Sequence, residues 1–169
     1  QDNLISWLDW RLLETNRDIF EFVKWLIAFR KKHGVFHMER EPRIMDYRSC
    51  GRPDVSYHGE YVWRPEFENF RRQIGILYCG TYAKKPDGQN DDFFFVIFNM
   101  HWEPHGFALP NLPKDLEWTL SFDTSDSAAG GYYEEGQERQ ILNQKNYMVP
   151  SRSVLVFQGK KKAKNLDKD

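Results

Sequence analysis

The chain has few of the features that mark disulfide-rich, membrane or nucleic-acid-binding proteins. Its 169 residues include two cysteines, Cys50 and Cys79, so at most one disulfide can form, and their spacing fits neither a metal nor a redox motif. No apolar run approaches the roughly 18 residues of a membrane span. The 24 Lys and Arg are balanced by 25 Asp and Glu, whereas a dedicated nucleic-acid binder is usually strongly basic. We therefore predict no membrane and no nucleic-acid partner, and two reduced, half-buried thiols in a cytoplasmic protein.

Local motifs of nucleotide, cofactor and metal chemistry are also missing. There is no Walker loop, and the glycine pair at 130–131 lacks the preceding strand and following helix of a dinucleotide fingerprint. His101, Glu103 and His105 resemble a metal motif, but Pro104 breaks the helical turn that would bring the two imidazoles together. A junction between a strand and a loop fits them better. We predict no cofactor and no metal site.

No residue of the chain qualifies as catalytic. Glycoside hydrolysis needs two carboxylates on facing sides of the scissile bond. Asp2 and Asp9 are the acidic candidates near a helical start, and they form no convincing acid and nucleophile pair. The serines at 56, 151 and 153 lack the flanking glycines of a nucleophile elbow.

Aromatic residues, in contrast, are abundant: 13 Phe, 8 Tyr and 6 Trp make up 16% of the chain. Disordered chains are poor in aromatics, and this length suffices for one domain with its own core. Most aromatics in such a domain are buried, but some here fall in loop-like segments, where they could stack on sugar rings. These candidates are Trp63, Trp102, Tyr132 and Tyr133, and we predict that Trp63 and Trp102 bind substrate.

A long helix is predicted over 16–33. Asn16 is a candidate N-cap, basic residues crowd the last turn, and Gly34 suits the left-handed position that ends a helix. Between 19 and 29 only Glu21 and Lys24 are polar. A surface helix usually has a single apolar stripe, so this one needs cover on two sides. We expect its own domain on one side and a missing partner on the other.

Two further segments flank this helix. Residues 1–15 carry apolar side chains at spacings of three and four, which indicates another short helix or an ordered loop. From 37 to 72 the periodicity is lost and proline and glycine interrupt the pattern. Because this stretch is long for a free connection and rich in aromatics, we predict a segment packed along the surface.

After Arg72 the pattern changes to short strands separated by turn residues. The predicted strands are 74–82, 93–99, 106–109, 118–122, 147–149 and 153–157. Several short strands with turn-rich links indicate an antiparallel sandwich. We therefore predict a mainly β fold, with an antiparallel β-sandwich over 73–159 preceded by one or two α-helices. The lysine-rich tail, 160–169, is predicted to be disordered.

The strand at 93–99 (FFFVIFN) is apolar on both of its faces. In an antiparallel sheet this implies cover on both sides. The long apolar helix is the natural second cover.

Several segments along the chain resemble a known family when they are read in order. They are QDNLISWLDW (1–10), FVKWLIAFRKKHGVF (22–36), GRPDVSYHG with the following VW (51–59 and 62–63), VIFNMHWEPHGFALP (96–110), WTLSFDT (118–124) and PSRSVLVF (150–157). Together they are similar to the end of a bacterial glycogen debranching enzyme of the isoamylase type, in glycoside hydrolase family 13.

The resemblance implies an (α/β) barrel followed by a C-terminal β-sandwich. Residues 1–36 would be the last helical segment of the catalytic barrel, 37–72 a linking segment, and 73–159 the sandwich. The family's catalytic carboxylates lie on earlier barrel strands, so the chain would not be catalytic alone. The resemblance also places Asp2 and Asn3 near the substrate cleft, where they would bind glucose hydroxyls.

In the parent enzyme, the implied reaction is hydrolysis of α-1,6 branch linkages in glycogen or limit dextrin by a retaining mechanism. The expected partners are α-glucan, through the parent barrel, and the rest of the parent chain on the 16–33 helix. The first residue is Gln1, so we expect a processed or excised chain. Alternatives are an autonomous α-glucan-binding module, the C-terminal domain of a pullulanase or branching-enzyme relative, and a domain that self-associates through its apolar helix.

Overall fold

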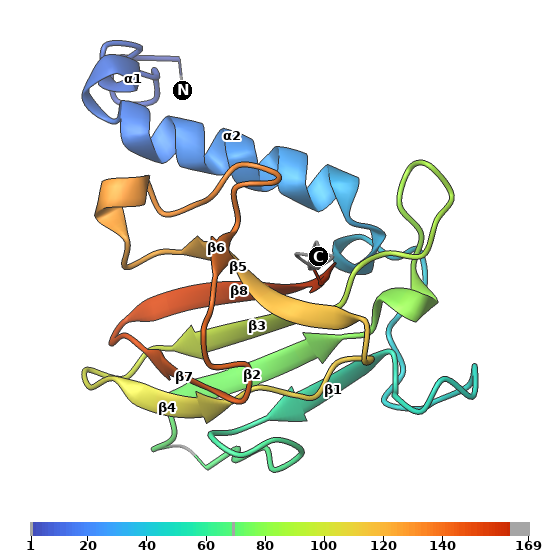
Figure 1. Ribbon diagram of the computed structural model, residues 1–169. Helices are drawn as coiled ribbons and strands as arrows, with labels where there is room; N and C mark the ends of the chain where they lie inside the picture. Colours follow the sequence, from blue (N-terminus) through green and yellow to red (C-terminus); the bar gives the residue numbers. More distant parts are fainter. Residues whose placement is uncertain (1, 69, 163–169) are drawn as a thin grey trace, which may run out of the picture.

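Two antiparallel sheets form the body of the chain, and a long helix crosses one of them (Figure 1). The computed structural model describes residues 2–68 and 70–162. In this part the larger sheet has the order β1-β2-β3-β8-β5-β6, and the smaller sheet pairs β4 with β7. The strands are β1 (Val55–His58), β2 (Gln73–Tyr78), β3 (Phe94–Asn99), β4 (His105–Ala108), β5 (Leu116–Asp123), β6 (Arg139–Gln140), β7 (Asn146–Val149) and β8 (Ser153–Lys161). The prediction of a mainly β, antiparallel, sandwich-like fold is confirmed.

Several strand bounds differ from the predicted ones, and two short strands, β1 and β6, were not predicted. The chain leaves β2 after Tyr78 and enters a 3₁₀ turn at Gly80–Tyr82, whereas the predicted strand continued to residue 82. β1 lies inside the 37–72 segment, for which no strand was predicted, and pairs along the edge with β2. β8 continues to Lys161 because β5 pairs with it along that length. Residues 163–169 of the predicted tail lie outside the described residues.

Strand β3 occupies the middle of the larger sheet and is covered on both faces, as its sequence predicted. It pairs with β2 and β8 in unbroken register. Phe95 and Ile97 point toward the smaller sheet, whereas Phe94 and Val96 point toward the helix. Successive side chains of a strand alternate between its faces, so the continuous apolar run serves two separate cores.

The first core fills the space between the two sheets. Its buried residues include Phe107 and Val149 from the smaller sheet and Trp118 from the larger one. The buried Trp118 donates its indole N–H to the carbonyl oxygen of Pro110 at 2.8 Å, which satisfies the polar atom of an otherwise apolar side chain. The second core lies between the larger sheet and the long helix.

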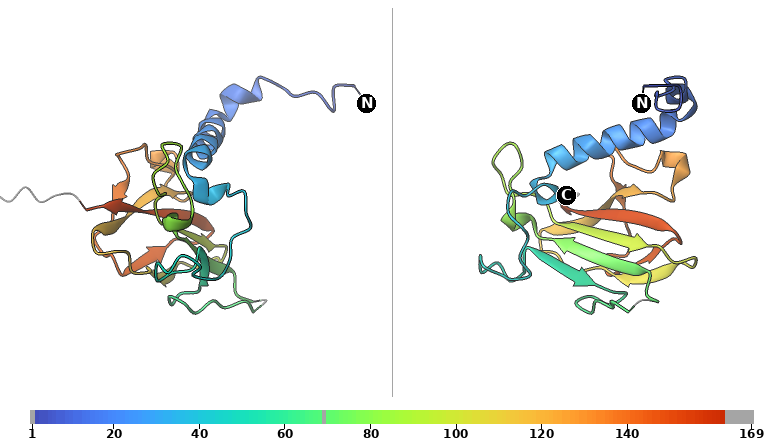
Figure 2. Two further views of the ribbon diagram at one scale, coloured as in Figure 1. Left: turned by 90° about the vertical axis from the view of Figure 1, so that its right-hand side faces the viewer. Right: turned by 180° about the vertical axis from the view of Figure 1, so that it is seen from behind.

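The helices precede the sheets in the chain. They are α1 (Leu12–Thr15) and α2 (Arg17–Lys32), followed by a 3₁₀ turn at Gly34–Phe36. Asp18 lies in the first turn of α2, and Arg30, Lys31 and Lys32 lie in the last, where each charge complements the helix dipole. Figure 2 shows α2 along one face of the larger sheet, with α1 and the N-terminal segment projecting beyond it.

The helix ends confirm one predicted detail and contradict another. Asn16 is the N-cap residue of α2, as predicted, but it makes no side-chain capping bond; its Nδ2 instead donates to the carbonyl oxygen of Leu12, because Asn16 also ends α1. Gly34 is not in the left-handed region, and His33 before it is extended. The reason for a glycine here is tertiary: a Cβ atom would collide with the carbonyl oxygen of Lys84.

Candidate functional site

One face of α2 packs on its own domain, with its side chains partly buried. Trp25 stacks on Phe29 at 4.8 Å between ring centroids and on Tyr132 at 5.1 Å. Phe29 also meets the edge of Phe94 from β3, with 5.5 Å between the ring centroids. These aromatic pairs fix the position of α2 on the sheet, because each pair stabilises the packing by more than the burial of its apolar surface alone.

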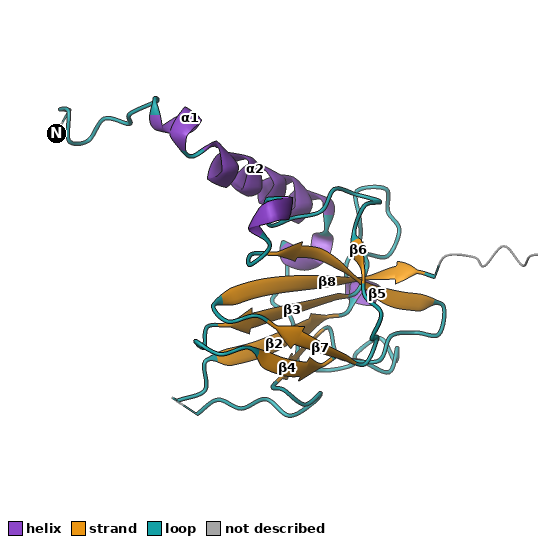
Figure 3. Ribbon diagram, turned by 60° about the vertical axis from the view of Figure 1, so that its left-hand side comes forward, coloured by secondary structure: helices purple, strands orange, loops and turns teal. Residues whose placement is uncertain are grey.

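The opposite face of α2 carries large apolar side chains in contact with solvent. They are Ile19 (59% exposed), Phe20 (47%), Val23 (45%) and Ile27 (52%). Exposed apolar side chains continue through α1 and the N-terminal turns, at Leu4, Ile5, Trp7, Leu8, Trp10, Leu12 and Leu13. We call these eleven residues the α1–α2 apolar surface. Figure 3 shows that, among residues 2–68 and 70–162, no strand or loop lies over the outer side of the two helices.

A surface of this kind is unusual for a free domain. Soluble monomers rarely expose contiguous apolar patches larger than a few hundred Å². The sequence predicted that α2 needs cover on two sides, and the described chain provides it on one. This surface is therefore the candidate functional site, and its chemistry is that of an interface.

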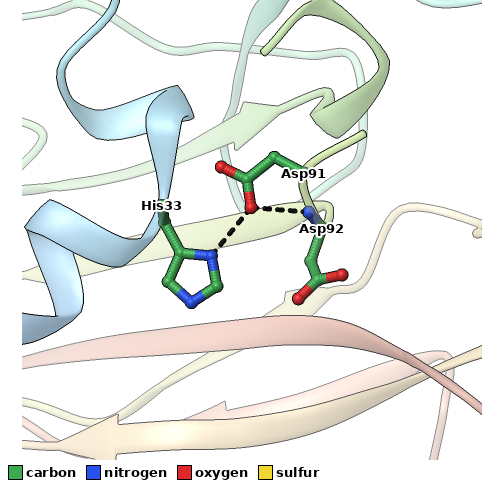
Figure 4. A group of neighbouring side chains, drawn as sticks. All are labelled: His33, Asp91 and Asp92. Atoms are coloured by element: carbon green, nitrogen blue, oxygen red, sulfur yellow. Dashed lines mark hydrogen bonds and ion pairs between the residues drawn. The ribbon is translucent and has the colours of Figure 1, made fainter. Parts of the chain in front are cut away.

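The other end of α2 is anchored by a buried polar cluster (Figure 4). The Nδ1 atom of His33 lies 2.7 Å from Asp91 Oδ1, and Asp91 also accepts the backbone N–H groups of Val35 and Asp92. Burial alone would raise the pKa of Asp91, but the hydrogen bonds from His33 and the Val35 amide and the attraction to His33 lower it overall. The carboxylate thus ties the helix end to the loop before β3.

His33, Asp91 and Asp92 have the composition of a metal site, because their ligand atoms lie within 4.8 Å of one another. Both carboxylates already accept hydrogen bonds, however. Asp92 accepts the ammonium of Lys85 at 2.8 Å and the side-chain amide of Gln158 at 2.6 Å. These contacts favour a structural role for the cluster.

The predicted metal-like motif around His101 is a loop between β3 and β4. His101 Nδ1 accepts the backbone N–H of Glu103 at 3.1 Å, so this nitrogen carries no proton. His105 Nδ1 lies 2.6 Å from a carboxylate oxygen of Glu60. This contact joins the first residue of β4 to the segment after β1, across 45 positions, and no local pattern indicates it.

The two predicted stacking residues, Trp63 and Trp102, are both partly exposed, at 49% and 58%. Trp63 has a left-handed backbone (φ 63°), and its N–H donates to Nδ1 of His58 at 2.9 Å. Trp102 stacks on His101 at 4.0 Å, with the guanidinium of Arg72 5.3 Å from its ring centroid. Both rings keep surface for a ligand, and their role in substrate binding stays a prediction.

The other candidate residues make contacts within the chain, and the role of Asp2 and Asn3 in substrate binding stays a prediction. Tyr132 packs on Trp25 beneath α2, and Tyr133 packs against the core between the sheets and donates its hydroxyl to Asp126 at 2.7 Å, so both rings are partly covered. The carboxylate of Asp2 accepts the indole N–H of Trp7, and Asn3 Oδ1 accepts the N–H of Ile5 at 3.0 Å.

The predicted substrate residues form two separate groups. The N-terminal segment lies at the α1 end of the molecule, whereas the loops after β1 and β3 lie across the sheets from it (Figures 1 and 2). The structure therefore does not bring Asp2 and Asn3 together with Trp63 and Trp102.

A small cavity lies beneath α2, beside His33. Its volume is about 170 Å³, and its lining includes Lys32, Glu135, Glu138 and Lys160. These four residues form the ion pairs Lys32–Glu135 and Lys160–Glu138. Small-molecule sites usually measure roughly 300–1,000 Å³, so this cavity is a poor candidate for substrate.

Comparison with known proteins finds similarity to part of a longer bacterial protein. No protein-family model matches it. It is 26% identical over 166 residues to proteins named "Glycogen operon protein GlgX homolog" from Mycobacterium bovis and from two strains of Mycobacterium tuberculosis. The match covers 93% of this chain and 22% of each relative, so the chain spans about a fifth of the length of these proteins. Within the described residues, no helix is both long and apolar enough to cross a bilayer.

Proposed function

We propose that this chain is a non-catalytic accessory domain of a glycogen debranching enzyme of the isoamylase type, in glycoside hydrolase family 13. Its α1–α2 apolar surface packs against the rest of that enzyme, and its β-sandwich stabilises the catalytic part. The whole enzyme hydrolyses α-1,6 linkages of glycogen or limit dextrin with carboxylates that lie outside this chain.

The observation that carries the proposal is the exposed apolar surface of the two helices. The similarity to glycogen operon proteins extends over 93% of the chain yet reaches 22% of their length, which leaves a large remainder to act as partner. The docking is energetically substantial. Full burial of a large aliphatic or aromatic side chain contributes about 1.5–3 kcal/mol, so covering the half-exposed Ile19, Phe20, Val23 and Ile27 contributes about 3–6 kcal/mol.

Glycogen debranching by the full-length protein tests the catalytic part of the proposal. We expect the full-length protein to release linear oligosaccharides from glycogen, measured as new reducing ends. The 169-residue chain alone should release no more than a heat-denatured sample. Release of reducing sugar by the isolated chain would refute the non-catalytic role.

Charged substitutions on α2 test the docking part. We expect Val23→Asp and Ile27→Asp, made in the full-length protein, to lower its thermal unfolding midpoint, because each places a carboxylate in an apolar interface. Leu142→Asp is the matched control, since Leu142 is a fully exposed leucine (103%) outside the helices. Equal effects of all three substitutions would show that α2 is not an interface.

A glucan-binding module is the second candidate, and the exposed Trp63 and Trp102 favour it. They lie on neighbouring loops that the contact between Glu60 and His105 joins. Titration of the chain with a branched maltooligosaccharide, followed by calorimetry, tests this role. Saturable binding that Trp63→Ala or Trp102→Ala abolishes would support it, and absence of binding at millimolar ligand would exclude it.

A further inference from the structure

The structure brings together two thiols that are distant in sequence. Cys79 directly follows β2, and its side chain is buried. Cys50 lies on the segment that precedes β1 and is partly exposed. Their sulfur atoms are 4.0 Å apart, which is van der Waals contact, and both residues are free thiols. The contact spans 29 positions and does not depend on residues outside the described chain.

The turn that carries Cys50 is held beside Cys79 by an organised set of hydrogen bonds. Asp46 accepts the hydroxyl of Tyr82 at 2.6 Å and the N–H groups of Cys50 and Gly51 at 3.1 and 2.7 Å. These bonds lower the pKa of Asp46 to about 2, and the bond from Tyr82 has the largest effect, so the carboxylate stays a charged acceptor. The backbone N–H of Cys79 itself donates to the carbonyl oxygen of Asp54, at the end of the same segment.

We infer that Cys50 and Cys79 are a modification site, a thiol pair that a hydroperoxide converts into a reversible disulfide between the Cys50 turn and the end of β2. A disulfide needs its sulfurs about 2.05 Å apart. Rotation of the partly exposed Cys50 side chain supplies the approach, because the Cys79 side of the contact is fixed in the core. Two thiols are too few ligands for a structural zinc ion.

The chemistry balances with the peroxide as the oxidant. The Cys50 thiolate, which solvent reaches, attacks the O–O bond and gives a sulfenic acid as the first water or alcohol leaves. Cys79 then attacks the sulfur of Cys50, the S–O bond breaks, and the second oxygen leaves as water. Two thiols lose two electrons and two protons, and the peroxide gains them. Burial raises the pKa of Cys79 to about 11, so the second step is the slow one at neutral pH.

Peptide mapping of the full-length protein tests this directly, because trypsin separates the two cysteines. Cleavage is blocked before Pro53 and Pro65, so Cys50 falls in the peptide 49–71 and Cys79 in the peptide 73–84. The protein is treated with hydrogen peroxide, its remaining thiols are blocked with a maleimide, and the digest is analysed by mass spectrometry. We expect the two peptides to be joined, with a mass two hydrogens below their sum, and to separate after treatment with dithiothreitol.

Two comparisons make the result decisive. In Cys50→Ser, Cys79 should remain a free thiol that reacts with maleimide only after denaturation. In the wild type, oxidation should raise the thermal unfolding midpoint by several degrees, since the disulfide closes a loop from 50 to 79. Recovery of Cys50 as a sulfinic acid, or in a bond with any other cysteine, while Cys79 stays free would overturn the inference. The wild-type digest gives this answer whether or not a variant folds.

Discussion

Lowering the pH from 7 to 5 should destabilise the chain through one buried imidazole, His58 of β1. Its Nδ1 accepts the N–H of Trp63, so the proton of the neutral ring is on Nε2, which lies 2.9 Å from the hydroxyl of Ser56. The ring also packs on the edge of Phe95. A second proton would sit on Nδ1 and face the N–H of Trp63, in a site without a compensating charge among these contacts.

The magnitude follows from the shift in pKa. Burial lowers the pKa of His58 from 6.5 to about 4. Between these values the unfolded chain binds a proton that the folded chain does not, so stability falls as the pH drops below 6.5 and levels off below 4. At pH 5 the loss relative to pH 7 is about 2 kcal/mol for this one group.

Urea unfolding of the chain at pH 7, 6 and 5 measures the loss, with His58→Asn as the comparison. Asparagine keeps an acceptor for the Trp63 amide but does not titrate in this range. We expect the variant to be less stable at pH 7 and to lose about 2 kcal/mol less than the wild type on going to pH 5. The reasoning is refuted if His58→Asn loses as much stability as the wild type.

Two other substitutions test the anchoring of α2, both by urea unfolding. Gly34→Ala should cost about 2–3 kcal/mol, because the added methyl group meets the carbonyl oxygen of Lys84 and one side must move; an unchanged midpoint would contradict this. Asp91→Ala should cost about 3 kcal/mol, since it leaves His33 and the Val35 amide without their buried acceptor. Asp87→Ala, on an exposed turn, should stay within about 0.5 kcal/mol of the wild type, and a similar loss in both variants would argue against the anchor.

The parts of the fold that follow from local pattern could be predicted from the sequence. The run at 93–99 indicated a strand covered on both faces, and Phe94 and Phe95 do point into different cores. Apolar residues around nearly the whole of α2 predicted a face that its own domain does not cover, and the exposed side chains of Ile19 and Val23 lie on such a face. In each case the signal is the spacing of apolar residues, which secondary structure translates directly into faces.

Features that depend on distant contacts could not be predicted in this way. β1 is a short edge strand of mixed polarity, and it is a strand because β2 pairs with it. Gly34 is explained by Lys84, and the meeting of Cys50 with Cys79 depends on how the segment before β1 folds back over β2. In each of these pairs the two partners are too far apart in sequence to belong to one turn or one strand. The spacing of apolar residues therefore gives no signal for the contact.

Hydroxyl-radical footprinting of the full-length protein tests the central claim most directly. It measures how fast each side chain is oxidised by solvent-borne radicals, and Phe20 and Leu142 are both exposed in this chain. If the α1–α2 apolar surface packs against the rest of a debranching enzyme, Phe20 and Trp10 should be labelled several-fold more slowly in the native protein than after denaturation, while Leu142 keeps its rate. Labelling of Phe20 and Trp10 at their denatured rates in the native full-length protein would contradict the claim.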